Sequence, residues 1–124
     1  MDFKIDTRNT FTTIMPLEKE ISAKLTGLLQ EKCEQMRQSG STNFIIDLQQ
    51  CTAIDKMAIP ELVAMHEMSY GQGQSLIFTG INDKVMAILK EDESNLLINI
   101  APSMIEAIDI VSMEILEREL YSEE

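Results

Sequence analysis

The sequence has few of the residues that most often carry metal binding and redox chemistry. Its 124 residues include one histidine, His66, and two cysteines, Cys33 and Cys51, that do not form a CxxC pair. A metal site would need carboxylates at ligand spacing around His66, and none stand out. Two unlinked thiols in a reducing cytosol are typical of buried apolar positions rather than of a disulfide or a redox pair. We therefore predict no metal, no cofactor and two buried thiols.

The sequence also lacks the residue patterns of an enzyme. Gly71 and Gly73 follow a predicted helix rather than a strand, so they indicate a helix end and a turn, not a phosphate-binding loop. His66 lies in the middle of that helix, which favours a packing or surface role over a general base. Asp47 ends a buried strand, but the acidic pair and the lysine that a phosphorylated receiver domain needs are missing. We expect a protein without catalytic activity.

Basic residues and long apolar runs are scarce as well. Ten Lys and Arg stand against twenty-one Asp and Glu, a net charge of −11. This charge repels nucleic acid and anionic lipid over roughly 8–10 Å. The longest apolar runs fall well short of the ~18 residues that span a bilayer, and no signal peptide is visible. We therefore predict a cytoplasmic protein that binds no nucleic acid and does not insert into a membrane.

Apolar residues, in contrast, are plentiful and regularly distributed. The composition of 44% hydrophobic and 25% charged residues is that of an ordinary globular protein. The length fits one domain over residues 1–124. Residues 114–124 carry five acids and one base, which predicts a solvated helix end that frays, with an acidic docking tail as the alternative.

Alternating strand and helix patterns predict an α/β fold. Residues 2–6 and 10–20 have strand character and should form an antiparallel pair, with Pro16 at an unpaired edge or a bulge. The elements expected after them are, in order, a helix over 22–38, a strand over 43–48, a helix over 57–70, a strand over 75–79, a helix over 82–91, a strand over 96–100 and a helix from residue 103. Such alternation requires crossover connections. We therefore predict a single mixed sheet of about five strands, antiparallel at its N-terminal edge pair and otherwise parallel, with about four helices.

The segment 43–68 resembles the centre of the STAS domain family, which includes anti-sigma-factor antagonists and the cytosolic domains of sulfate transporters. In that family an apolar strand ending in Asp-Leu is followed, after a loop, by an apolar residue, Asp, two hydroxyl residues, Gly and a Leu-rich helix that often carries a His. The residues that fall in those positions are Asp47, Leu48, Ile54, Asp55, Leu62, Val63, Ala64 and His66. The order of elements agrees as well, so the resemblance covers about residues 2–118 and implies a STAS-like fold.

The sequence departs from the family at its phosphorylation motif. Family members that act as switches carry Ser or Thr two places after the motif Asp, where this chain has Met57. A thioether cannot be phosphorylated. Lys56 replaces the first hydroxyl residue and Ala58 replaces the Gly, so the resemblance implies a degenerate motif without the usual phospho-switch. Thr52, in the same loop, is a possible alternative phosphoacceptor, although a turn hydroxyl bonding to local backbone is the simpler interpretation.

The resemblance implies a non-catalytic protein-interaction module of the anti-sigma-factor-antagonist type, with a role in signalling and regulation of transcription. We predict that it binds its partner through loop 49–57 and the start of the second helix. The expected contact residues are Asp55, Lys56, Met57, Ile59 and Glu61. The alternative is that Asp55 only caps the helix and Met57 only covers the loop.

The expected partner is a histidine-kinase-like anti-sigma factor. A second function stays open, that of a cytosolic STAS accessory subunit of a membrane transport complex, in which the same face docks on a transporter ATPase. A third is a small-ligand sensor.

Overall fold

A computed structural model describes residues 2–122 and contains one five-stranded sheet and one two-stranded sheet. The strands are β1 (Phe3–Thr7), β2 (Thr12–Pro16), β3 (Glu20–Ile21), β4 (Phe44–Asp47), β5 (Ala53–Ile54), β6 (Leu76–Thr79) and β7 (Ile100–Ala101). The helices are α1 (Ala23–Gln38), α2 (Ile59–Gly71), α3 (Asp83–Glu91) and α4 (Met104–Ser122), with 3-10 turns η1 (Lys56–Ala58) and η2 (Ser94–Leu96). The main sheet has the order β1-β2-β4-β6-β7; β1 and β2 pair antiparallel and its other pairs are parallel. The predicted α/β fold is confirmed.

Short polar residues fix where the helices begin. The Ser22 hydroxyl accepts a hydrogen bond from the Leu25 N–H at 3.1 Å and caps α1. The Asn82 side chain accepts one from the Val85 N–H at 2.8 Å and caps α3 in the same way. Pro60 lies in the first turn of α2, where its missing N–H costs nothing. The caps of α1 and α3 explain why these helices begin where the sequence predicts, whereas α2 begins two residues later than predicted because residues 56–58 form η1.

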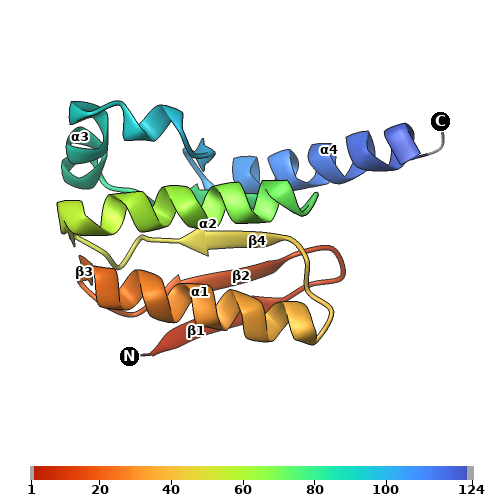
Figure 1. Cartoon of the computed structure of the whole chain (residues 1–124), viewed down its shortest axis with the longest axis horizontal. Helices are drawn as coiled ribbons and strands as arrows, with labels where there is room; N and C mark the ends of the chain where they lie inside the picture. Colours follow the sequence, from red (N-terminus) through yellow and green to blue (C-terminus); the bar gives the residue numbers. More distant parts are fainter. Residues whose placement is uncertain (1, 123–124) are drawn as a thin grey trace.

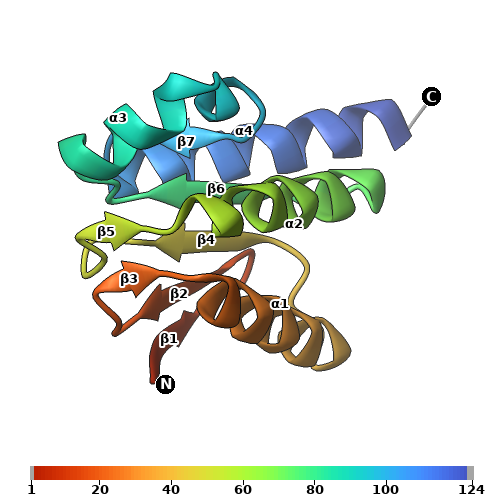
Figure 2. The ribbon, with the colours of Figure 1, turned by 60° about the vertical axis from the view of Figure 1, so that its left-hand side comes forward.

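Helices cover the two faces of the sheet unequally, as Figures 1 and 2 show. The larger core lies between the sheet and α1, α2 and α3, and the side chains of Phe44 and Ile46 point into it. The smaller core lies under α4 alone and contains Ile45 and Ile77. Side chains of β4 and β6 therefore alternate between two cores, as the unbroken apolar runs of a strand buried on both faces predict.

Two of the predicted strands are shorter than expected. The predicted strand 10–20 ends as β2 at Pro16, and Glu20–Ile21 instead forms β3, which pairs with β5 in the small sheet. Pro16 is paired with Phe3 of β1, so it does not lie at an unpaired edge on that side. Toward β4 it is unpaired as predicted, because it lies two residues past Ile14, where the pairing of β2 with β4 ends, and its missing N–H interrupts no ladder there.

The predicted strand over 96–100 is wrong for most of its length. Glu93 adopts a left-handed conformation with φ of 63°, and the N–H groups of Leu96 and Leu97 then bond to the carbonyls of Glu93 and Ser94 at 3.0 Å. Since these N–H groups are used in the 3-10 turn η2, they are not available to a strand. Only Ile100–Ala101 pairs with β6 as β7.

Helix α4 is continuous to Ser122. Glu123 and Glu124, the last two acids of the predicted tail 114–124, lie outside the described residues. The fraying of that tail and the extent of the domain over 1–124 stay predictions.

Gly80 allows the loops after β4 and β6 to touch. Its φ is +74°, and a Cβ placed there would lie 2.5 Å from Asp47 Oδ1 and 2.9 Å from the Gln49 backbone nitrogen. Asp47 Oδ1 itself accepts a hydrogen bond from the Gln49 N–H at 3.1 Å, so the loop after β4 is fixed against Gly80. A larger residue would push the two loops apart.

We predict that Gly80→Ala lowers the free energy of unfolding by about 1–3 kcal/mol, because alanine is strained at positive φ and its Cβ meets backbone. Gly27→Ala is the matched control, since Gly27 lies within α1 with open space around its Cα. That change should raise the free energy of unfolding by about 0.5–1 kcal/mol. Urea denaturation of both variants measures the difference, and equal stabilities would contradict the prediction.

Candidate functional site

Loop 49–57 follows the carboxyl end of β4 and is held by backbone hydrogen bonds. The N–H groups of Thr52 and Ala53 both donate to the Lys19 carbonyl, at 2.7 and 3.1 Å, and the Asp55 N–H donates to the Ile21 carbonyl at 2.9 Å. These bonds belong to the pairing of β3 with β5. The sequence does not predict this pair, because strands of two residues leave no periodic pattern. The loop is thus fixed along much of its length.

Asp55 caps η1, and the turn holds Met57 out into solvent. Asp55 Oδ1 accepts a hydrogen bond from the Met57 N–H at 3.0 Å, and the Asp55 carbonyl accepts one from the Ala58 N–H at 2.9 Å. Ala58 is fully buried, whereas Met57 is 74% exposed. Asp55 therefore does act as a cap, for η1 rather than for α2. The Met57 side chain projects outward and does not cover the loop.

Lys56 ties this turn to the end of α3. Its Nζ lies 2.9 Å from Glu91 Oε2, and both side chains are largely exposed. The hydrogen bond that the Lys56 ammonium donates to this carboxylate raises the pKa of Lys56. An exposed pair of this kind contributes little to stability, so Lys56 remains free to exchange Glu91 for another acid.

Ile59 and Glu61 face the protein rather than solvent. Ile59 is 5% exposed and belongs to the larger core. The Glu61 carboxylate accepts a hydrogen bond from the Thr26 hydroxyl and so joins α2 to α1. Of the five predicted contact residues, the structure thus brings Asp55, Lys56 and Met57 together on an exposed surface, which we call the Met57 surface. Ile59 supports it from below.

Thr52 has an exposed side chain whose hydroxyl lies 3.5 Å from the Lys19 carbonyl oxygen, to which it donates. This is the local backbone bond expected of a turn threonine. Because the side chain is exposed, the hydroxyl is also accessible from solvent, and its role as a phosphoacceptor stays a prediction.

The fold agrees with what comparison with known proteins finds. Residues 2–107 match the STAS domain family. The chain belongs to this family. No curated protein matches the sequence closely enough to count as a relative.

Solved structures similar to this STAS domain include the protein TM1081 of Thermotoga maritima, with a TM-score of 0.76, 18% identity and 90% coverage of both chains. An anti-sigma factor antagonist from Mycobacterium paratuberculosis has a TM-score of 0.74 and 12% identity, over 90% of this chain and 93% of the other. The murine anion transporter Slc26a9 has a TM-score of 0.65 and 14% identity, over 84% of this chain and 18% of the transporter. At such identities the likeness concerns the fold.

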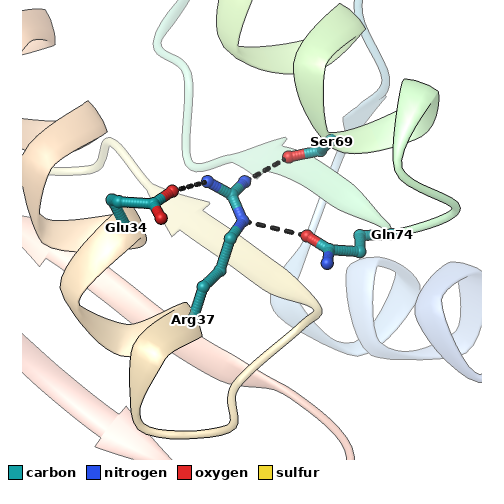
Figure 3. A network of polar contacts seen from close by, with 4 residues as sticks. All are labelled: Glu34, Arg37, Ser69 and Gln74. Atoms are coloured by element: carbon teal, nitrogen blue, oxygen red, sulfur yellow. Dashed lines mark hydrogen bonds and ion pairs between the residues drawn. The ribbon is translucent and has the colours of Figure 1, made fainter.

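Arg37 joins α1 to α2 of the STAS domain near the amino end of β6 (Figure 3). Its guanidinium donates to Gln74 Oε1 at 2.9 Å and to Ser69 Oγ at 2.8 Å, lies 3.4 Å from Glu34 Oε2, and sits 5.3 Å above the Phe44 ring. The side chain is only 12% exposed. Its hydrogen bonds indicate a structural role rather than ligand binding.

A cavity of about 260 Å³ lies next to Arg37 between α1 and α2. The residues that line it are Gln30, Glu31, Cys33, Glu34, Arg37, Met65, Met68 and Leu76. Cys33 and Cys51 are both free and buried, as predicted, and burial raises the pKa of each thiol to about 11. Thiols of this kind stay protonated near neutral pH and are poor nucleophiles. The cavity is therefore not a cysteine active site.

Neither a metal cluster nor a membrane-spanning helix occurs within residues 2–122. No three His, Cys, Asp or Glu side chains in this range are placed to hold a metal ion. No helix there is both long and apolar enough to cross a bilayer.

His66 is half-buried and packs against Tyr70. Its ring lies 4.5 Å from the Tyr70 ring, and Nε2 is buried without a hydrogen-bond partner among the described residues. The Tyr70 hydroxyl donates to Glu114 Oε1 at 2.7 Å and so links α2 to α4. Burial lowers the pKa of His66, and the carboxylates of Glu114 and Glu67 oppose the shift. The neutral imidazole is therefore the form that the fold prefers.

We predict that His66 titrates below the ordinary pKa of about 6.5. Because the folded pKa is lowered, the stability from this group is complete above about pH 6.5 and is lost as pH falls through the folded pKa. Since the chain has one histidine, a pH titration of the imidazole proton NMR signals measures the pKa of His66 directly. Glu114→Gln should lower the pKa further, whereas Glu34→Gln, on α1, should leave it unchanged. A pKa at or above 6.5 would contradict the prediction.

Proposed function

We propose that this STAS domain is a non-catalytic protein-interaction module that docks a regulatory protein through the Met57 surface. The observation that carries the proposal is a large apolar side chain, 74% exposed, presented by a capped and hydrogen-bonded turn. The partner that we propose is a kinase-type anti-sigma factor. This choice is supported by the structural neighbours, several of which are anti-sigma factor antagonists.

The rigidity of the turn favours binding. The backbone of 52–58 already bonds to Lys19, Ile21 and Asp55, so little conformational freedom remains to be lost when a partner docks. The thioether side chain is flexible and polarisable, so it adapts to an apolar pocket of the partner. Around it, Asp55 and Lys56 provide the polar rim that protein interfaces commonly have.

The position of Met57 also bears on regulation. It stands where switching members of the family carry the phosphorylated hydroxyl residue, at the start of a helix. Phosphate there adds a charge of about −1.5 to −2 and changes the contact with a partner. Met57 offers no acceptor oxygen, so we infer that docking through this surface is not released by phosphorylation at this position. Docking is then either controlled by phosphorylation of Thr52 or not controlled by phosphorylation of this loop.

We predict that Met57→Glu reduces partner affinity by roughly 30- to 1,000-fold, about 2–4 kcal/mol, because a buried apolar anchor is lost and an unpaired charge is buried. The melting temperature should stay nearly unchanged, since the side chain is exposed and an acid suits the start of a helix. The partner is captured by cross-linking on the wild-type chain and then titrated against both proteins.

Met68→Glu provides the matched control, because Met68 is an exposed methionine of α2 that lies away from the Met57 surface. It should bind like wild type. If Met57→Glu and wild type bind the partner equally well, the Met57 surface is not the docking site. If Met57→Glu greatly lowers the melting temperature, Met57 belongs to the core. Capture of a transporter ATPase instead of a kinase-type protein would favour the accessory-subunit function.

We also predict that a kinase-type anti-sigma factor with ATP transfers no phosphate to residues 55–58, which contain no hydroxyl group. Intact-mass spectrometry after the incubation, followed by peptide mapping, checks this. Stoichiometric phosphate on Thr52 would show that the switch lies elsewhere in the loop, and Thr52→Val, which keeps the shape of the side chain, would then abolish it.

A further inference from the structure

The outward face of α4 carries apolar side chains that the domain itself does not bury. Helix α4 packs on the sheet through Ala107 and Val111, which are fully buried. On the rest of its surface Ile105, Met113, Leu116 and Leu120 are 75%, 62%, 56% and 57% exposed. A large apolar side chain exposed on its own is ordinary, but these four on one helix, with Tyr121 also exposed, call for an explanation.

The spacing of these residues places them on one stripe. At about 100° per residue, positions 105, 113, 116 and 120 fall within roughly 80° of one another around the helix. We call these four residues the α4 stripe. A stripe of this width is what an amphipathic helix normally buries against a neighbour. Helix α4 therefore has two apolar faces, one against the sheet and one toward solvent.

The charge beside the α4 stripe is of one sign. Asp109 lies within the stripe by its helical angle, and Glu106 and Glu117 follow its border; all three side chains are exposed. The one basic residue in the sequence of α4, Arg118, points to the sheet, where it donates to Ser75 Oγ at 3.1 Å and to Asn43 Oδ1 at 2.9 Å. The stripe thus combines apolar contacts with negative charge.

This combination indicates the chemistry of the occupant. A second copy of the chain would place acids against acids in a protein that already carries a net charge of −11. A partner helix with large aliphatic residues on one face and Lys or Arg beside them would pack on the apolar stripe and pair with the neighbouring carboxylates. We propose that the α4 stripe docks a basic amphipathic helix of a partner protein.

The arrangement of the layers separates this surface from the first. Helix α4 lies on the face of the sheet opposite α1 and α2, and in Figure 1 its last turns extend past the end of α2. The turn η1, which carries Met57, packs against α1 and α2 and so belongs to the other face. The two surfaces can be occupied together, so the domain would connect two proteins. This inference does not depend on the function proposed for Met57.

The first test uses a fluorescein-labelled 18-residue peptide of Leu and Lys, with leucines at i, i+3, i+4 and i+7, and a scrambled peptide of the same composition. Binding is measured by anisotropy at about 150 mM salt and mapped by amide chemical shifts. We expect the patterned peptide to bind at least about tenfold more tightly than the scrambled one, with shifts concentrated in 104–122. Equal binding of the two peptides, or shifts spread over the acidic surface, would overturn the proposal.

The second test removes the stripe. Leu116→Ser with Leu120→Ser should weaken peptide binding at least about tenfold without lowering the melting temperature, because both side chains are more than half exposed. Leu96→Ser with Leu97→Ser is the matched control, since these two exposed leucines lie at η2, and it should bind like wild type. Met57→Glu should also leave peptide binding unchanged.

Sedimentation equilibrium of the chain alone tests the rival occupant. We expect a monomer. A dimer that dissociates when Leu116 and Leu120 become serine would assign the stripe to a second copy and overturn the proposal, as would a double variant that binds the peptide with wild-type affinity.

Discussion

The parallel pairing of β4 with β6 is the interaction on which the rest of the molecule depends. These strands are paired from Phe44 with Leu76 to Asp47 with Thr79, and they lie at the centre of the sheet. Their side chains alternate between the core under α1 and α2 and the core under α4. Burial of this apolar surface on both faces is the main favourable contribution to the free energy of folding. The helices are positioned by packing against these two faces.

The candidate site follows from the same pair of strands. The carboxyl ends of β4 and β6 bring Asp47, Gln49 and Gly80 into contact, and the loop after β4 then runs to β5. The pairing of β3 with β5 fixes that loop, and Asp55 closes the turn on which Met57 stands. A rigid core thus supports a short exposed segment, the arrangement in which proteins commonly place binding residues.

Both proposed surfaces use apolar side chains that the fold does not need. Met57 and the α4 stripe contribute little to either core, so their exposure is not explained by packing within the domain. Met57 stands on a turn that packs with α1 and α2, whereas the stripe belongs to α4 on the opposite face of the sheet. Their surroundings also differ, since Met57 lies beside Lys56 whereas the stripe is bordered by acids. Two such surfaces on one small domain would let it join two proteins, as we propose.

The sequence by itself determined the order of the four helices and the five strands of the main sheet, the starts of α1 and α3, and the family, because these depend on local periodicity, capping residues and a run of motif positions around Asp47 and Asp55. It also placed Met57 at the start of a helix. Only the tertiary structure decided which residues there are exposed. Ile59 turns into the core and Glu61 toward Thr26, since α2 packs on α1. The β3–β5 pair, the 3-10 turn at Ser94 and the outward face of α4 depend on contacts between distant segments, which local patterns do not encode.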